Sequence, residues 1–319
     1  MSAMVRSKKY DISIVIPVYR SEKILPDLIA RIREALQDRS FEVILVHDCG
    51  PDNSWQVIVE LCKTNPMVRG FNLRHNVGQH NAIMAGLNAV RGKIVVTMDD
   101  DLQHAPDDIA MLCEQVRNGF DVCYAKFPAR HHALWKRLGS KFNDMLARIL
   151  LRKPKDLYLS PFKAFSRELA DEIVKYRGVS IYIDSIILSL TRNITSVEAK
   201  HHPRLHGTGG YSLLKSTRLL MRMSTSTTII PLRIAMLMGL LLSFSGLVLA
   251  ILLVVQRFTW NAMPVGWSSV VVASLILGGA QLSCIGIVGE YIGNIFMMLT
   301  GKPQYTVAAS ANVEDENAQ

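Results

Sequence analysis

Two long segments without a charged residue constrain the fold of this chain more than any other feature of its sequence. They cover residues 234–255 and 265–288, and both are rich in leucine, isoleucine and valine. A helix rises about 1.5 Å per residue, so each segment is long enough to cross a hydrocarbon core of about 30 Å. A small soluble domain has little room to bury two such helices after its sheet is complete. The sequence therefore predicts two transmembrane helices.

Basic residues flank the outer ends of these segments, whereas the only charged residue among the connecting residues 256–264 is Arg257. Because positive residues favour the cytoplasmic side of a membrane, we expect both termini to be cytoplasmic. A basic, amphipathic helix is predicted over residues 211–223 and would lie on the bilayer surface. The flanking basic residues are Lys215, Arg218, Arg222, Arg233 and Lys302.

These features divide the chain into four parts. We expect a cytoplasmic domain over 1–210, an interfacial helix and linker over 211–231, a two-helix transmembrane domain over 232–299 and a cytoplasmic tail over 300–319. The tail after Ala309 is polar, and we expect it to be disordered.

Within the first hundred residues, short β-branched runs alternate with segments of helical periodicity. Strands are predicted over 12–18, 41–47, 68–72 and 93–98, with helices over 24–36, from 54 to about 63 and within 74–90. Such alternation implies crossover connections and a mostly parallel sheet, so the chain is predicted to be an α/β protein. Ligands of these sheets bind beyond the carboxyl ends of the strands, where Asp48, Asn76 and Asp99 would lie.

Three adjacent aspartates follow the fourth predicted strand. Asp99, Asp100 and Asp101 would repel one another unless a cation lay among them. If the extended geometry continues past the strand, Asp99 and Asp101 point the same way and Asp100 the other. Carboxylates suit Mg²⁺ or Mn²⁺, which would bridge to a diphosphate, and Gln103 could add a neutral oxygen. The alternative is a solvated turn at the start of the next helix.

Other polar clusters have structural explanations. Asp107 and Asp108 suit the first turn of a helix, where acids favour the helix dipole. The five cysteines have no metal-binding or disulfide spacing, which is typical of a reducing compartment.

The net charge of +9 implies a polyanionic partner, which could be nucleic acid, anionic lipid or a phosphorylated substrate. Residues 126–141 interleave basic and aromatic side chains, a pattern found in nucleic-acid binders. No nucleic-acid-binding motif accompanies this pattern, and a phosphate-bearing ligand explains the same charge. We therefore expect a lipid bilayer and a phosphorylated substrate as partners, and no nucleic acid.

Five motifs, in this order, resemble those of one enzyme family. They are SIVIPVYR at 13–20, Asp48 followed by PDNS, RHNVGQHNAIMAGL at 74–87, MDDDLQH at 98–104 and GEYIG at 289–293. Over nearly its whole length the chain resembles the polyprenyl-phosphate glycosyltransferases of glycosyltransferase family 2. That group includes dolichol-phosphate mannose synthase and bacterial undecaprenyl-phosphate sugar transferases of the aminoarabinose and O-antigen glucosyl types.

The resemblance implies a GT-A, Rossmann-like glycosyltransferase domain over 1–210 and an enzyme of the bacterial inner membrane. The enzyme would move a sugar from a nucleotide diphosphate sugar to polyprenyl (undecaprenyl) phosphate, for lipopolysaccharide, O-antigen or another envelope glycan. A phosphate monoester has a second pKa of about 6, so the acceptor is already largely dianionic and no strong general base is required. We expect a single displacement with inversion at the sugar carbon.

The resemblance also implies residue roles. The catalytic residues would be Asp99, Asp101 and Arg204. The nucleotide would contact Pro17, Tyr19, Asp48, Asn76 and Asp100, the metal (Mg²⁺ or Mn²⁺) would contact Asp99, Asp101 and Gln103, and the acceptor phosphate would contact Lys136, Arg137, Ser140 and Arg204. His47, Cys49, Lys136 and Gly210 depart from residues frequent in the family, which leaves the base and the sugar of the donor open.

Two other interpretations remain. One is a membrane-anchored protein that binds a nucleotide sugar without turnover, and the other is a polysaccharide synthase, although the chain lacks the QxxRW motif of processive synthases. Copies of the chain could also pack into a homo-oligomer through small residues of the second apolar segment. These are Gly278, Gly279, Gly286 and Gly289.

Overall fold

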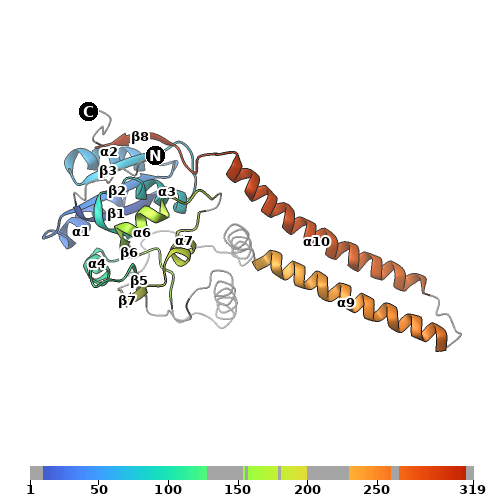
Figure 1. Ribbon diagram of the computed structural model, residues 1–319. Helices are drawn as coiled ribbons and strands as arrows, with labels where there is room; N and C mark the ends of the chain where they lie inside the picture. Colours follow the sequence, from blue (N-terminus) through green and yellow to red (C-terminus); the bar gives the residue numbers. More distant parts are fainter. Residues whose placement is uncertain are drawn as a thin grey trace. The chain divides into compact units, whose positions relative to one another are not determined.

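The computed structural model describes residues 10–127, 154, 157–178, 181–199, 230–259 and 266–313. The chain forms two compact units, one of Met1–Ser212 with Pro303–Gln319 and the other of Leu213–Lys302. The first unit contains a sheet with helices on both faces, and the second contains two long helices (Figure 1).

Strands and helices alternate through the first unit, as the sequence predicts. Its first half contains β1 (Tyr10–Val18), α1 (Leu25–Ala35), β2 (Phe41–His47), α2 (Ser54–Thr64), β3 (Val68–Leu73), α3 (Gln79–Leu87) and β4 (Gly92–Thr97). Its second half contains η1 (Pro106–Asp108), α4 (Ile109–Arg117), β5 (Val122–Lys126), β6 (Lys163–Ser166), α6 (Arg167–Ile173), α7 (Ile183–Leu190), β7 (Ile194–Glu198) and β8 (Val307–Ala311).

The eight strands form one sheet in the order β7-β5-β6-β4-β1-β2-β3-β8. Strands β1 to β4 pair in parallel, whereas β6 is antiparallel to β4 and β5. The mostly parallel, Rossmann-like sheet is thus confirmed. Because the chain crosses from β3 over to β4 on the other side of β1, the strand order reverses between β1 and β4. Such a switch point leaves a crevice at the carboxyl ends of the strands, where α/β proteins bind ligands.

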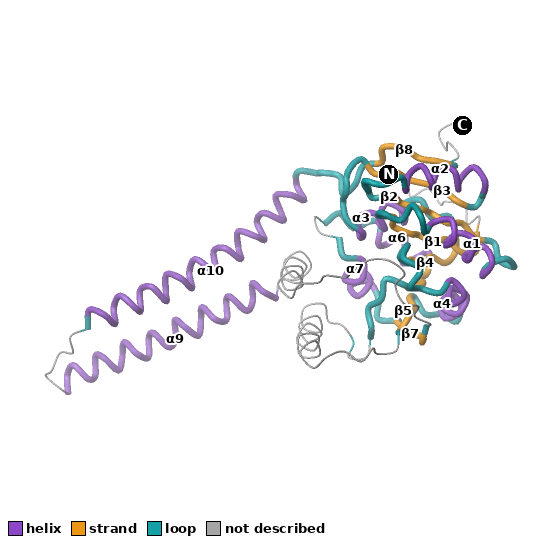
Figure 2. The backbone as a smooth tube through the Cα atoms, turned by 180° about the vertical axis from the view of Figure 1, so that it is seen from behind, coloured by secondary structure: helices purple, strands orange, loops and turns teal. Residues whose placement is uncertain are grey.

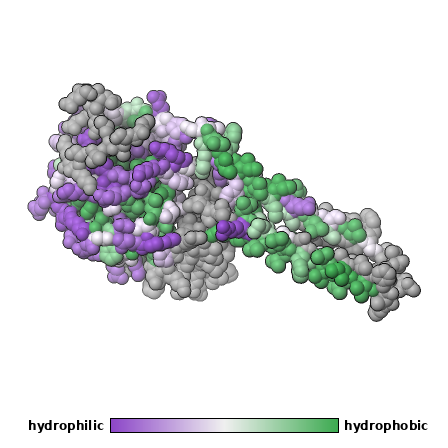
Figure 3. Space-filling view, viewed as in Figure 1, coloured by the Kyte–Doolittle hydropathy of each residue, from purple (hydrophilic) through white to green (hydrophobic). Residues whose placement is uncertain are grey.

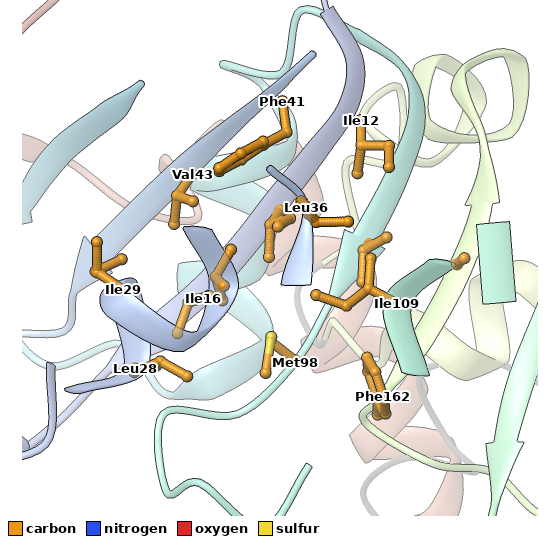
Figure 4. Packing of buried hydrophobic residues seen from close by; sticks show 14 of the residues in the cluster. Ile12, Ile16, Leu28, Ile29, Leu36, Phe41, Val43, Met98, Ile109 and Phe162 are labelled. Carbon is orange, nitrogen blue, oxygen red and sulfur yellow. The ribbon is translucent and has the colours of Figure 1, made fainter. Parts of the chain in front are cut away.

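Alternating side chains of the central strands pack against helices on both faces. Ile12, Ile14 and Ile16 of β1 belong to a buried cluster with side chains of α1, α2 and α4. Val15 of β1 belongs to a second buried cluster with side chains of α3, α6 and α7. Figure 4 shows part of the first cluster, which includes Phe41 of β2 and Leu36, the residue after α1. Both faces of the sheet are therefore covered, and the exposed parts are the edges and the strand ends.

Residues 310–313, the described part of the tail after Ala309, do not follow the expectation of a disordered segment. Residues Val307–Ala311 form β8, which pairs antiparallel with β3 at one edge of the sheet (Figure 2). The side chain of Gln304 donates hydrogen bonds to the carbonyls of Tyr176 (3.1 Å) and Gly178 (3.0 Å), and Asn312 donates to those of Pro66 and Val68. For these described residues the prediction was wrong because backbone groups of β3 pair with this segment, and side-chain polarity reveals nothing about such pairing.

The second unit contains the antiparallel helices α9 (Ile230–Thr259) and α10 (Trp267–Leu299). They lie side by side, and the thiol of Cys284 approaches the carbonyl of Ala235 at 3.9 Å. Apolar side chains dominate the described surface of both helices (Figure 3). Within α10, residues Leu277–Leu299 are long and apolar enough to cross a membrane, and Leu232–Val248 of α9 is a shorter apolar segment. The described residues thus contain one candidate span by length and hydropathy.

Candidate functional site

A cavity of about 390 Å³ lies at the carboxyl ends of β1, β2 and β4, at the switch point of the sheet. Eight residues were predicted to bind the nucleotide or the metal, and all of them except Gln103 line this cavity. The lining residues are Pro17, Val18, Tyr19, Asp48, Asn76, Gly78, Gln79, Asp99, Asp100 and Asp101. The structure therefore brings together residues that lie up to 84 positions apart in the sequence, from Pro17 to Asp101.

Asp48, directly after β2, positions one wall of the cavity. Its carboxylate oxygens accept hydrogen bonds from the backbone N–H groups of Val77 (2.7 Å) and Gly78 (2.9 Å), and Asn76 donates its side-chain amide to the Asp48 carbonyl. Gly78 has φ of +87°, a left-handed conformation that favours glycine, and α3 begins at the next residue. Burial raises the pKa of Asp48 above its usual value, although the two backbone hydrogen bonds lower it.

The three aspartates after β4 do not continue the geometry of the strand. Strand β4 ends at Thr97, and Leu102 has φ of +57°, so the chain turns sharply here. The condition for Asp99 and Asp101 to point the same way by strand alternation is therefore not met. Asp99 accepts a hydrogen bond from the Gln79 side chain (2.6 Å), and Asp101 accepts one from the Gln103 side chain (2.6 Å).

The side chain of Asp100 contacts the loop that follows β1, whereas Asp99 and Asp101 contact Gln79 and Gln103. Its Oδ2 atom accepts hydrogen bonds from the backbone N–H of Tyr19 (3.1 Å) and from the hydroxyl of Ser21. Burial raises the pKa of Asp100, while the hydrogen bonds from Ser21 and Tyr19 lower it. Asp100 thus joins the ends of β1 and β4 across the switch point.

A stack of three aromatic rings contacts the loop that contains Asp99, Asp100 and Asp101. The backbone N–H of Asp99 lies 3.3 Å from Nδ1 of His104, which can accept its hydrogen bond. The His104 ring, which is buried, stacks on the rings of Phe127 and Phe162 with centroid distances of 5.5 and 5.1 Å. This histidine therefore holds the backbone of the loop.

The donor set at the cavity suits a hard divalent cation. Four aspartates line it, and none of its described lining residues is a lysine or an arginine. Carboxylate oxygens are preferred ligands of Mg²⁺ and Mn²⁺, which usually take further ligands from substrate phosphates and water. In the described part of the chain no three His, Cys, Asp or Glu side chains form a metal cluster, so a cation here would need ligands from a substrate.

One predicted residue does not line the cavity, and four lie outside the described residues. Gln103 is not among the lining residues, and its side-chain amide nitrogen is directed at Asp101. The predicted acceptor-phosphate residues lie outside the described residues, as does the predicted interfacial helix over 211–223. Those acceptor-phosphate residues are Lys136, Arg137, Ser140 and Arg204.

Sequence reasoning missed Gln79 and a polar cluster that includes its neighbour in the chain, His80. Gln79 follows Gly78 at the start of α3, and a polar residue at the first position of a helix near the strand ends was the available signal. In the cluster, Lys163 of β6 pairs with Asp184 of α7, which also accepts a hydrogen bond from Tyr124 at 3.0 Å. The ring of Tyr182 meets the ring of His80, the residue after Gln79, edge to face. No local pattern indicated this cluster, because its members come from four separate elements.

The profile of "Glycosyl transferase family 2" matches residues 13–174, which include every described lining residue of the cavity. The chain belongs to glycosyltransferase family 2. It is 32% identical over 315 residues to an undecaprenyl-phosphate 4-deoxy-4-formamido-L-arabinose transferase of Proteus mirabilis, with 96% of this chain and 95% of the relative covered. An enzyme of the same description from Pectobacterium atrosepticum is 33% identical, with 93% and 92% covered. The resemblance seen in the sequence motifs is thus confirmed.

Solved structures of glucosyl-3-phosphoglycerate synthase from Mycobacterium tuberculosis share the fold. The complex of that enzyme with Mn²⁺, uridine diphosphate and phosphoglyceric acid superposes with a TM-score of 0.52 at 18% sequence identity, covering 68% of this chain and 77% of the other. A second complex, with Mn²⁺, uridine diphosphate and glucosyl-3-phosphoglycerate, has a TM-score of 0.51. This likeness confirms the GT-A fold of the first unit.

Proposed function

We propose that this family 2 glycosyltransferase transfers a sugar from a nucleotide diphosphate sugar to undecaprenyl phosphate, with inversion, at the cytoplasmic face of the bacterial inner membrane. The observation that carries the proposal is similarity over the full length to enzymes described as undecaprenyl-phosphate sugar transferases. The acidic cavity at the switch point is the place for the donor. The product would serve modification of lipopolysaccharide or a related envelope glycan.

The donor diphosphate and the four aspartates of the cavity cannot share one site without positive charge between them. A divalent cation held by Asp99 and Asp101 would supply that charge and stabilise the leaving diphosphate. Both related crystal structures of the mycobacterial enzyme contain Mn²⁺ with uridine diphosphate, which supports a divalent cation in this fold. Mg²⁺ and Mn²⁺ are both suited to the oxygen donors present.

The remaining residues would bind and orient the donor. Tyr19, whose side chain is 45% exposed at the cavity, offers an aromatic face to the nucleotide base, beside Pro17. Hydrogen bonds between Asp48 and the segment that contains Asn76 and Val77 hold the loop before α3. Gln79, the first residue of α3, would orient the carboxylate of Asp99 through its hydrogen bond. Because a phosphate acceptor is already anionic, the protein does not need to remove a proton from it. The proposed acceptor groups are Lys136, Arg137, Ser140 and Arg204.

The connection of the chain supports the proposal of two membrane spans. Strand β8 comes after α10 and belongs to the same sheet as β1 to β7, which come before α9. If the helical pair enters a membrane, its two ends would lie on the same side, because a single crossing by α10 alone would separate β8 from the rest of its sheet. At about 1.5 Å per residue, the 30 residues of α9 and the 33 residues of α10 are long enough for two crossings. This supports two spans with both chain ends in the cytoplasm.

The test is transfer by the purified, full-length protein in lipid. We would incubate it with undecaprenyl phosphate, Mn²⁺ and a panel of UDP-, GDP- and dTDP-sugars, and identify the lipid product by its mass. We expect one sugar added per lipid phosphate. A product that grows by many sugars would indicate a polysaccharide synthase, and nucleotide binding without a product would indicate a binding protein.

The matched variants are Asp101→Ala in the cavity and Asp107→Asn, an exposed aspartate in η1 that does not line it. Asp101→Ala should reduce transfer by about a hundredfold or more, because it removes a metal ligand, while membrane insertion is retained. Asp107→Asn should transfer as the unmodified protein does. Full activity of Asp101→Ala would refute the assignment of the site.

A further inference from the structure

Building on the proposed function, we propose that Asp100 is a positioning residue that fixes the loop after β1 to the loop after β4, so that the base-binding and diphosphate-binding parts of the donor site are held as one unit. This differs from the expectation that Asp100 binds the nucleotide directly. The assignment rests on where its carboxylate is directed. Its Oδ2 atom accepts hydrogen bonds from the Tyr19 backbone N–H and the Ser21 hydroxyl, so this oxygen binds groups of the protein itself.

The contact crosses the switch point of the sheet. Tyr19 directly follows β1, whereas Asp100 follows β4 and is separated from Tyr19 by 81 positions in the sequence. Between these strand ends lies the crevice in which the donor would bind. A bond across a crevice sets its width, so the Asp100 contact determines the distance between the exposed aromatic ring of Tyr19 and the metal-binding Asp99 and Asp101.

The loop after β1 requires such a support. Arg20, between the two donors, has φ of +60°, a left-handed conformation that is unfavourable for a residue with a side chain. Its guanidinium lies 5.2 Å from the centre of the Tyr19 ring. The hydrogen bonds of Tyr19 and Ser21 to Asp100 flank Arg20 on both sides, and they hold the loop in this conformation.

The tie extends to the loop after β2. The backbone N–H of Ser21 donates to the Ser54 hydroxyl at 3.0 Å, and that hydroxyl donates to Asp52 at 2.7 Å. Asp52 also accepts the backbone N–H of Glu22 at 3.2 Å. Three loops from three neighbouring strands are therefore joined by one chain of hydrogen bonds that begins at Asp100. None of these groups is needed for metal binding, so the chain can be weakened without removing a metal ligand.

The kinetic consequence is specific. Loss of the tie should weaken binding of the nucleotide, because Tyr19 is no longer held at a fixed distance from the diphosphate site, while Asp99 and Asp101 still bind the metal. We expect Asp100→Ala to raise the KM for the donor by about tenfold or more, with kcat within about threefold of the unmodified enzyme. Asp100→Asn keeps an oxygen that accepts both bonds and should restore most of the affinity.

Ser21→Ala is the second arm, since it removes a donor to Asp100 and leaves all four cavity aspartates in place. It should raise the KM by a smaller factor than Asp100→Ala. The double variant should resemble Asp100→Ala alone, because both changes remove the same contact. Effects that multiply, a large loss of kcat, or an Asp100→Asn variant as impaired as Asp100→Ala would instead show direct contact of Asp100 with metal or substrate and overturn the proposal.

Affinities for UDP, GDP and dTDP, each with Mn²⁺, measured by calorimetry on the same full-length variants, separate this proposal from the proposed function. If the unmodified protein forms the lipid product and Asp100→Ala binds nucleotide equally well, the positioning role is wrong and the transferase function stands. If no lipid product forms but nucleotide affinity falls in the expected order of variants, the transferase function is wrong and the positioning role stands. An unmodified protein that binds none of the three nucleotides would overturn both.

Discussion

The two ends of the same four parallel strands carry acidic side chains in opposite settings. At the amino ends, Glu42 of β2 is fully buried and accepts hydrogen bonds from Ser13 (2.6 Å), from the Arg69 guanidinium (3.1 Å) and from the backbone N–H of Arg91 (2.6 Å). These partners come from β1, from β3 and from the residue before β4. At the carboxyl ends, four aspartates surround an open cavity.

The difference separates structural charge from functional charge. At the amino end the protein neutralises its own carboxylate with an arginine, and the packing leaves no room, since a Cβ on Gly92 would lie 2.6 Å from the backbone nitrogen of Ser13. At the carboxyl end, Asp48 and Asp100 accept hydrogen bonds from backbone N–H groups and a hydroxyl, all of them neutral donors. Under the proposed function a bound cation, rather than an arginine of the protein, would balance the charge at that end.

The largest expected effect is on stability, at the amino end. Glu42→Ala leaves the Arg69 guanidinium buried without its carboxylate, which should reduce the free energy of unfolding by about 3–5 kcal/mol. Thermal and denaturant unfolding of the detergent-solubilised protein measures this loss. The KM for the donor, determined on the folded fraction, should not change. A change in KM without a loss of stability would contradict the comparison.

The second effect is a pH dependence of stability, and it concerns His80, which lies in the first turn of α3 next to the cavity residue Gln79. Burial lowers the pKa of His80 to about 4, the charge of Lys163 on β6 acts in the same direction, and Asp184 on α7 opposes them. The unfolded chain binds a proton near pH 6.5 and the folded chain only near pH 4, so stability should fall as the pH drops through this interval. The loss attributable to His80 should approach roughly 3 kcal/mol at pH 4.

Melting temperatures between pH 7.5 and pH 4 check this expectation, with His80→Leu as the control that removes the titrating group. The control should lose stability less steeply over the same interval. Identical slopes for the two proteins would show that His80 is not kept neutral by its surroundings.

A smaller effect should follow from Asp48→Asn. Both oxygens of Asp48 accept backbone N–H groups, from Val77 and Gly78, and an asparagine can offer an oxygen to only one of them. We expect a loss of stability of about 1–3 kcal/mol together with weaker nucleotide binding, because the same loop lines the cavity. Calorimetry with UDP, GDP or dTDP and Mn²⁺ measures the second part. A loss of stability without weaker nucleotide binding would show that Asp48, like Glu42, has a structural role only.

The smallest effect is expected from an exposed ion pair at the amino end. Lys93 and Asp11 lie 3.0 Å apart, with side chains 59% and 45% exposed. Lys93→Ala should change the free energy of unfolding by less than about 1 kcal/mol, and added salt should reduce even this difference. Comparison with Glu42→Ala then shows that burial, rather than the presence of an ion pair, gives the amino end its stability. An effect as large as that of Glu42→Ala would contradict this.

Local patterns in the sequence determined a large part of this protein. The β-branched runs predicted β1 to β4 because continuous apolar runs are typical of strands buried on both faces, and the helical periodicities predicted the helices between them because they report which side of a helix is buried. The sequence also predicted that the aspartates after β2 and β4 lie close together, since parallel strands bring their carboxyl ends to one edge of the sheet. The uncharged segments likewise predicted α9 and α10 from their own composition.

The tertiary structure decided which distant groups meet. Asp100 and Tyr19, Lys163 and Asp184, and β3 and β8 lie far apart in the sequence, and no periodicity in either partner reveals the other. The chain turns sharply at Leu102, and the three aspartates accept hydrogen bonds from different partners, whereas extended geometry would have pointed Asp99 and Asp101 the same way. Local sequence encodes which face of an element is buried, whereas the partner of a hydrogen-bonding group depends on how the elements pack.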